Sequence, residues 1–240
     1  MNIWILVAVA IEGLALLGVL GILITRRTLP AFLAGFNAMA VVTAIYVWHA
    51  DFSPRSALVM AMVAIYLVRI NWTLVFWSGQ TALGKLDGRT PVLQKLLLPV
   101  VLTNTVGWAY CLPFYFATRN PDPLGLSDAV AIGVYLVGTV FHFGGDYQKR
   151  RFKLQAGTED KLLDSGFWAL CRHPNYFGDF LIYVSFALVG GSVWGWVAPL
   201  LNVLQYAFDA IPKNEKWAAE RYGPEWEAYK AKKQIVKAIA

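Results

Sequence analysis

The chain has 240 residues, of which 58% are hydrophobic and 15% are charged, and its mean hydropathy is +0.50. Soluble domains carry closer to about a quarter of charged residues, so a soluble globular protein is excluded. The net charge of +6 suits an anionic lipid surface and needs no nucleic acid to explain it. Cys111 and Cys171 are too few for a disulfide framework, and we expect both to be small buried hydrophobes.

Seven apolar segments follow one another along the chain and predict an all-α, polytopic membrane bundle. We expect spans at residues 3–25, 30–49, 56–78, 96–117, 127–147, 174–192 and 194–211. A spanning helix needs about 20 apolar residues, which the first five segments reach and the last two barely do. We interpret the first segment as a span and not as a removed signal peptide, and the whole chain as one transmembrane domain.

The basic residues predict the orientation of these spans. If the N-terminus is outside, only Arg55 and Arg119 fall in outside loops and Arg69 falls within a span. All other Lys and Arg residues then face inside, as the positive-inside rule requires. We therefore expect a cytoplasmic C-terminus and, from the short chain without a retention signal, a bacterial inner membrane.

The segment after the seventh span is too polar to cross a membrane. Its aromatic residues Trp217, Tyr222, Trp226 and Tyr229 recur every three to five positions. Two short helices that meet near Gly223 would place these rings on one face. This face is either an interfacial aromatic anchor or a cover that closes over a cofactor.

Ionisable groups inside a bilayer are costly, so each one is a functional hypothesis. Glu12 lies in the first predicted span, and Tyr66 and Arg69 lie in the third. Glu12 either pairs with Arg69 to hold two helices together or acts as a proton donor or ligand contact. Other polar residues of the spans are Asn71, Trp72, His142, Asp146, Asn175 and Asp179.

Two stretches carry groups of the kind that can bind a nucleotide. Lys149, Arg150 and Lys153 share one helix face, where cations can bind phosphate or lipid. In residues 163–179, Pro174 marks a helix start, and helix N-termini favour anions. Asn175 and Asp179 follow one turn apart on that helix. Cations, a carboxylate, an amide and aromatic rings together predict a site for an adenine-type nucleotide, without a metal.

The run Leu162-Leu163-x-Ser165-Gly166-x-Trp168, continued by Arg172-His173-x-Asn175-Tyr176-Phe177-Gly178-Asp179, resembles the signature of the membrane sterol reductases. That family carries a Gln-Lys-x-x-Phe-Arg motif upstream, and here stand Gln148, Lys149, Phe152 and Lys153. The steroid 5α-reductases are similar in the same C-terminal half and carry a Tyr-x-x-Arg motif like Tyr66-x-x-Arg69. The resemblance covers about residues 140–230.

This resemblance implies an NADPH-dependent reductase that acts on a C=C bond of a sterol, steroid or isoprenoid-like substrate in the membrane. Residues 1–126 would supply the helices on the substrate side, and residues 127–240 the cofactor-binding half. The cofactor residues implied are Asp146, Lys149, Lys153, Trp168, Arg172, His173, Asn175, Tyr176, Asp179 and Tyr229. Tyr66 is the candidate proton donor, helped by the nearby cation Arg69, and Glu12 is a further catalytic candidate.

Two departures from these families keep other functions open. Sterol reductases carry His-Arg-x-x-Arg-Asp where this chain has Asp209-Ala-Ile-Pro-Lys-Asn214. The second span also lacks the acid that 5α-reductases pair with their tyrosine, which argues against a 3-oxo-steroid.

The alternative is an S-adenosylmethionine-dependent methyltransferase. Isoprenylcysteine and phospholipid methyltransferases carry a motif similar to Arg172-His-Pro-Asn-Tyr-Phe-Gly178 and two tail acids, of which only Glu215 stands here. S-adenosylmethionine has no phosphate, so the cationic cluster favours the reductase. The third alternative is a lipid- or sterol-binding membrane protein that has no catalytic activity.

Overall fold

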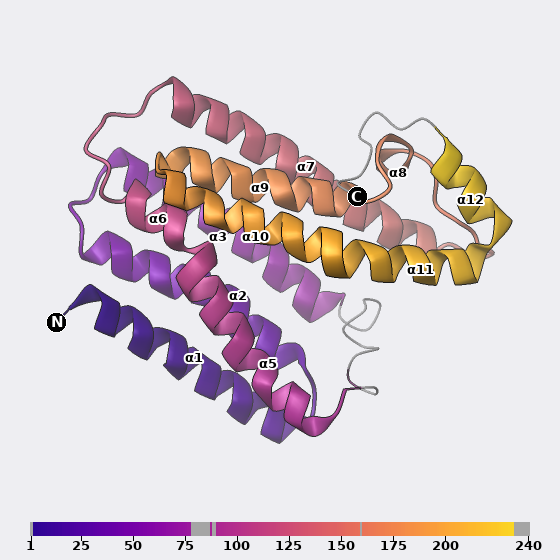
Figure 1. Ribbon diagram of the computed structural model, residues 1–240, viewed down its shortest axis with the longest axis horizontal. Coiled ribbons are helices and arrows are strands. Elements are labelled where there is room, and N and C mark those ends of the chain that lie inside the picture. Colours follow the sequence, from indigo (N-terminus) through magenta and orange to yellow (C-terminus); the bar gives the residue numbers. More distant parts are fainter. Residues whose placement is uncertain (1, 78–86, 88–89, 159, 233–240) are drawn as a thin grey trace. The chain divides into compact units, whose positions relative to one another are not determined.

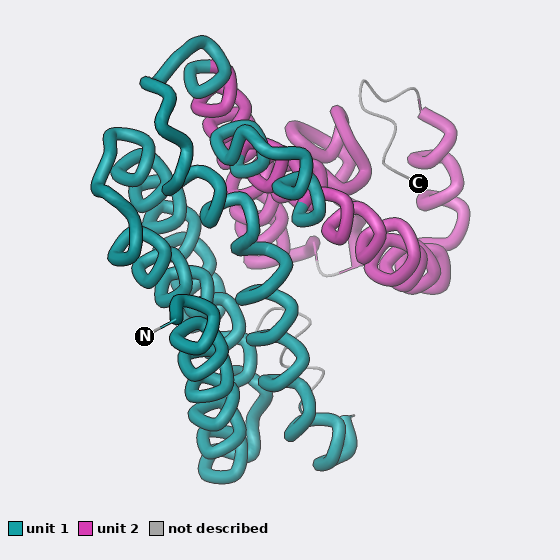
Figure 2. The backbone as a smooth tube through the Cα atoms, turned by 60° about the vertical axis from the view of Figure 1, so that its left-hand side comes forward, with its two compact units in different colours: residues 1–129, 186–198 teal, residues 130–185, 199–240 magenta. Residues whose placement is uncertain are grey.

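The computed structural model describes residues 2–77, 87, 90–158 and 160–232, and every regular element in these ranges is a helix (Figure 1). The predicted all-α class is therefore confirmed. The chain forms two compact units (Figure 2). Unit 1 comprises residues 1–129 and 186–198, and unit 2 comprises residues 130–185 and 199–240. The expected division at residue 126 into a substrate half and a cofactor half stays a prediction.

The first part of the chain forms long apolar helices. They are α1 (Ile3–Thr25), α2 (Leu29–Trp48), α3 (Pro54–Phe76) and a broken helix made of α5 (Val92–Asn104), the π-helix η2 (Thr105–Tyr110) and α6 (Leu112–Ala117). Local signals set two of the starts, because Asn2 caps α1 and Ser53 caps α3 through their side-chain oxygens.

The second part begins with the longest helix, α7 (Leu126–Lys153). It continues through α8 (Phe167–Leu170), α9 (Pro174–Gly190), the 3₁₀-helix η3 (Val193–Trp196), α10 (Val197–Gln205), the π-helix η4 (Tyr206–Ala210), α11 (Ile211–Tyr222) and α12 (Pro224–Ala231). The tail thus has the two short helices expected from its sequence, with Gly223 between them at φ 51°.

Five of the seven expected spans are long and apolar enough to cross a membrane: α1, α2, α3, the run Val92–Ala117 and α7. The sixth and seventh are helical, but α9 has 17 residues and α10 has 9, which is short of a full crossing. These two spans and the sidedness of the tail stay predictions.

Unit 1 packs its helices closely at small residues. A Cβ added to Gly35 of α2 would lie 2.7 Å from the Leu102 side chain, and one added to Gly107 would lie 2.4 Å from Ile11. Small residues of this kind let helices approach in membranes, where burial of apolar surface contributes little to association.

Arg55 and Asp128 form a buried ion pair in unit 1, with Nη1 2.5 Å from Oδ1. The same guanidinium donates to the carbonyl of Val189 at 3.2 Å and to those of Asp122 and Pro123 at 3.2–3.3 Å. Arg55 was expected in an outside loop. The structure instead buries it, where it joins the start of α3 to the segment before α7 and to the end of α9.

In unit 2 the backbones of α7 and α9 cross almost in contact. A Cβ added to Gly178 would lie 2.2 Å from His142 N and 2.5 Å from Gly138 O, closer than any side chain allows. One turn further, a Cβ on Gly145 would meet Pro174 at 3.1 Å and the Asn175 nitrogen at 3.2 Å. Glycine at these positions is what lets the start of α9 lie against the C-terminal half of α7.

This crossing predicts a large effect of a single methyl group. Gly178→Ala must push two helix backbones apart, so we expect it to lower the free energy of unfolding by at least about 1–3 kcal/mol, the usual cost of overpacking. Gly133→Ala, also in a helix but with nothing within 4 Å of its added Cβ, is the matched control and should be neutral. Thermal unfolding in detergent measures both. Equal stability of the two variants would contradict the close crossing.

Candidate functional site

Asp179 is the centre of a buried polar network in unit 2 and is only 5% exposed. Its Oδ2 accepts hydrogen bonds from Asn202 Nδ2 at 2.9 Å and from the Tyr206 hydroxyl at 2.6 Å. On the other side, Oδ1 lies 3.3 Å from His142 Nδ1. The carboxylate expected to contact a cofactor is thus surrounded by side chains of the protein.

Sequence reasoning missed Asn202 and Tyr206. The signal for them was available, since two polar residues four positions apart stand on a mostly apolar helix. Their position at the junction of α10 and the π-helix η4 also fits a functional region, because π-bulges often mark such sites.

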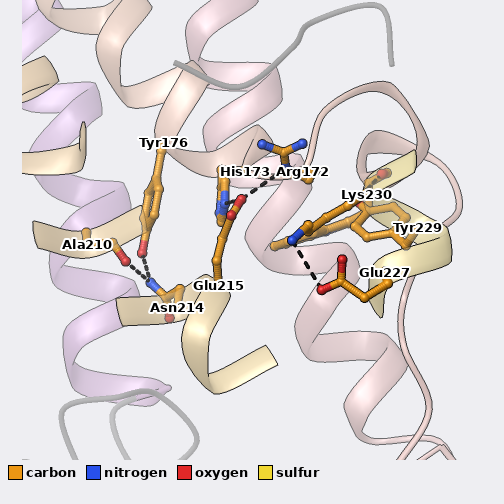
Figure 3. Close-up of polar contacts among 10 residues, drawn as sticks. Arg172, His173, Tyr176, Ala210, Asn214, Glu215, Glu227, Tyr229 and Lys230 are labelled. Carbon is orange, nitrogen blue, oxygen red and sulfur yellow. Dashed lines mark hydrogen bonds and ion pairs between the residues drawn. The ribbon is translucent and has the colours of Figure 1, made fainter. Parts of the chain in front are cut away.

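Three aromatic rings form a parallel stack beside this network. Tyr206 stacks on Tyr176 with ring centroids 4.3 Å apart, and Tyr176 stacks on His173 at 5.4 Å. The Tyr176 hydroxyl accepts a hydrogen bond from Asn214 Nδ2 at 2.6 Å (Figure 3). The spacings leave no room for another ring within the stack.

A carboxylate from the tail meets the predicted cations at the start of α9 (Figure 3). Glu215 Oε1 lies 3.0 Å from Arg172 Nε and 3.2 Å from His173 Nε2. Burial lowers the pKa of His173 below its usual value, against the opposing effect of Glu215. The hydrogen bond with His173 and the charge of Arg172 lower the pKa of Glu215. Glu215 entered the sequence comparison only as a tail acid of methyltransferases, and its contact with Arg172 and His173 was not expected.

Trp168 connects α7, the loop before α9 and the tail. Its Nε1 donates to the Gly145 carbonyl at 3.1 Å, and its own carbonyl accepts a hydrogen bond from the Tyr229 hydroxyl. The Lys149 ammonium lies 4.8 Å from the centroid of the Trp168 ring, within range of a cation–π interaction. Three predicted cofactor residues therefore lie together, with Lys149 exposed.

The Gln148 side chain holds the loop that leads to Trp168. Its Nε2 donates to the Ser165 carbonyl at 2.9 Å, and its Oε1 accepts from the Phe167 N–H at 3.0 Å. Gly166, at φ 60°, leaves the space that this amide fills, since an added Cβ would lie 2.3 Å from Nε2. The Gln-Lys and Ser-Gly-x-Trp motifs thus form one local structure.

The tail helices lie against the segment before α8. Lys153 donates at 3.0 Å both to the Lys161 carbonyl and to the Tyr222 hydroxyl. Trp226 and Tyr229 are buried with Ala218 in a small cluster, against which Leu162 and Tyr222 pack. Trp217 was expected on the same face, but it is 40% exposed and meets the ring of Tyr222 edge to face at 5.9 Å.

Asp146 and Asn175, the other predicted cofactor residues, are half-buried on α7 and at the start of α9. All ten predicted cofactor residues belong to unit 2, and the three catalytic candidates belong to unit 1.

Within unit 1, Tyr66 is 2% exposed and meets the ring of Phe186 edge to face at 6.2 Å. Arg69 follows about one turn later on α3 and is half-buried. Glu12 Oε1 accepts a hydrogen bond from Asn104 Nδ2 at 3.1 Å, so the partner of this carboxylate is on α5 and is not Arg69. Asn71, which the sequence also marked as polar in a span, forms a reciprocal amide pair with Asn37 of α2.

Residues 29–233 match the family described as "Protein of unknown function (DUF1295)". The chain belongs to this family.

Curated relatives share about a quarter of their aligned residues with the chain. A Delta(14)-sterol reductase of Ascobolus immersus is 28% identical over 192 residues, which are 69% of this chain and 43% of that protein. A Delta(14)-sterol reductase of Mus musculus is 28% identical over 141 residues, 52% of this chain and 33% of that protein. A 7-dehydrocholesterol reductase of Danio rerio is 25% identical over 161 residues, which are 52% of this chain and 33% of that protein. The chain thus spans less than half the length of these relatives. Within the described residues five helices are long and apolar enough to cross a membrane, and the chain is an integral membrane protein.

The contacts of Glu215 with Arg172 and His173 predict how stability depends on pH. The folded pKa values of His173 and Glu215 lie below their usual 6.5 and 4.5, so the unfolded chain binds more protons on acidification. Stability is therefore greatest above pH 6.5 and falls as the pH decreases, first through His173 and then through Glu215. The other charges that act on the imidazole, Lys149 and Arg172, work in the same direction.

We expect His173→Gln to flatten the fall in melting temperature between pH 7 and pH 5, a window that contains the usual histidine pKa of about 6.5. His49→Gln, at the exposed end of α2, is the control and should leave the slope unchanged. An identical slope in wild type and His173→Gln would show that the imidazole titrates normally.

Proposed function

We propose that this protein is an NADPH-dependent reductase of a C=C bond in a lipophilic, sterol-like membrane substrate. The observation that supports it best is the assembly in unit 2 of an exposed lysine, Lys149, and a half-buried arginine, Arg172, beside a stack of aromatic rings. Such a combination suits a ligand with phosphates and planar bases. The sterol reductases among the relatives agree with it.

The predicted cofactor residues are not equally available to bind the phosphates of a dinucleotide. Lys149 is exposed, and the terminal nitrogens of Arg172 have no hydrogen-bond partner among the described residues, so these two side chains would hold phosphates. Lys153 already donates to two oxygens of the protein and would contribute mainly charge. Asn175 and Asp146 would contact ribose or base.

Asp179 and Tyr229 would not contact the cofactor directly but would position other residues of the site. Asp179 orients Tyr206 and, through it, the stacked rings of Tyr176 and His173, while Tyr229 fixes the Trp168 backbone. When bound, the cofactor supplies the hydride.

A proton donor would complete the reduction. Tyr66 is the proposed donor, and the guanidinium of Arg69 one turn away would stabilise the phenolate that remains. Glu12 is the second candidate, held by Asn104. The soluble cofactor would enter from the cytoplasm, which is where the proposed orientation places the C-terminal tail, in a bacterial inner membrane.

One observation favours a second function. Glu215 contacts both Arg172 and His173, the first residues of the motif that resembles the methyltransferases. An S-adenosylmethionine-dependent methyltransferase would use this arrangement without the phosphate-binding lysine. Ligand binding separates the two.

We expect the protein purified in detergent to bind NADPH and not S-adenosylmethionine, as measured by isothermal titration calorimetry. Lys149→Ala should weaken NADPH binding about tenfold, the loss of one charge-assisted contact to a phosphate. Arg151→Ala removes an exposed cation on the same helix and should change little. Binding of S-adenosylmethionine alone would replace the reductase by the methyltransferase, and binding of neither would favour the lipid-binding protein.

Turnover tests the proton donor. Tyr66→Phe keeps the buried ring and its contact with Phe186 but removes the hydroxyl. We expect unchanged NADPH binding and a rate of NADPH oxidation lowered about 10²–10⁴-fold, the usual contribution of a general acid. The assay would use the sterols named in the relatives, a Δ14-sterol and 7-dehydrocholesterol. A variant as fast as wild type would exclude Tyr66 as the donor.

A further inference from the structure

Arg172 uses only one part of its guanidinium within the protein. Its Nε contacts Glu215 Oε1 at 3.0 Å, and no hydrogen-bond partner of its two Nη atoms is found in residues 2–77, 87, 90–158 and 160–232. Figure 3 shows both Nη atoms directed away from Glu215. The side chain keeps 19% of its surface exposed. Two parallel N–H donors of this kind match two oxygens of a phosphate.

Glu215 is itself held firmly. The same Oε1 that meets Arg172 lies 3.2 Å from Nε2 of His173, whose side chain is 8% exposed and whose ring is stacked on Tyr176. The neighbouring Asn214 donates to the Tyr176 hydroxyl and to the Ala210 carbonyl. This part of α11 is therefore fixed relative to the start of α9, within unit 2.

We propose that Glu215 is a positioning residue for a phosphate-binding arginine. By accepting the Nε–H bond it fixes the plane of the Arg172 guanidinium, so that the two Nη atoms face a phosphate of the ligand. The inference rests on the proposed function for the identity of that ligand, a dinucleotide. The geometry fits equally the phosphate of an anionic lipid headgroup.

Glu215 acts on a phosphate in two opposed ways that substitutions can separate. Its contact orients Arg172, which favours binding, while its negative charge repels the ligand. Gln in its place keeps an oxygen for the Nε–H and removes the charge, whereas Ala removes both. A role as a mere counter-ion and a role in positioning therefore predict different orders of affinity.

The experiment measures the dissociation constant of NADPH for variants in detergent, each first checked for an unchanged melting temperature. We expect Glu215→Ala to weaken binding about tenfold and Glu215→Gln to bind as tightly as wild type or more tightly. In an Arg172→Ala background, Glu215→Ala should cause no further loss, because its effect passes through Arg172. Glu220→Ala, an exposed acid on the same helix, is the control.

Two results would overturn the proposal. One is tighter binding by Glu215→Ala than by wild type, which would make Glu215 only a competing charge. The other is an equal loss in the presence and absence of Arg172, which would make its effect independent of the arginine.

A failure of the proposed function can be told apart from a failure of this inference. If wild type binds no NADPH, the dinucleotide is wrong, and the same variants are titrated with inorganic pyrophosphate and with a short-chain phosphatidylglycerol. If either probe gives the predicted order of affinities, the phosphate site stands, and that probe shows whether its ligand is a soluble phosphate or a lipid headgroup. Absence of that order for both probes would overturn it.

Discussion

The close crossing of α7 and α9 is the constraint on which the candidate site depends. With Gly138 on one helix and Gly178 on the other, the two backbones meet at a separation that no side chain would allow. The approach continues to Gly145, which lies against Pro174 and Asn175. It brings the polar end of α7 beside the start of α9, so that two motifs separated in sequence become neighbours in unit 2.

Once the helices are this close, the polar groups at their interface must satisfy one another. Asp179 accepts hydrogen bonds from α10 and η4 and lies 3.3 Å from the imidazole of His142 on α7, which suits a buried carboxylate. The tail contributes Glu215 and Tyr229 to the same region, one to Arg172 and one to the Trp168 carbonyl. Lys149 is exposed and Arg172 is partly exposed, and these are the two cations that we propose to bind the phosphates of a ligand.

Unit 1 has a different balance of forces. Its helices pack through small residues and through the few polar pairs that a membrane helix can tolerate, such as Asn37 with Asn71. The buried pair of Arg55 with Asp128 also joins segments far apart in the chain. Such pairs are costly to break, so they help to hold the folded helices together. Polar residues in apolar helices therefore need not all be catalytic. Asn71 shows how a polar residue that the sequence marked as a functional candidate can serve packing.

The sequence by itself determined the helical class, five of the expected spans and the segments that hold the candidate site. Hydropathy and helix signals act over a few neighbouring residues, so they can be read along the chain. Side-chain partners across helices cannot be read in this way. A pair with Arg69 was one of two alternatives for Glu12, which is found with Asn104. Asn202 and Tyr206 were missed, and so were the contacts of Glu215 with Arg172 and His173. Only the tertiary structure decided which predicted residues are buried in the protein's own network and which remain exposed, because that depends on how closely the helices approach.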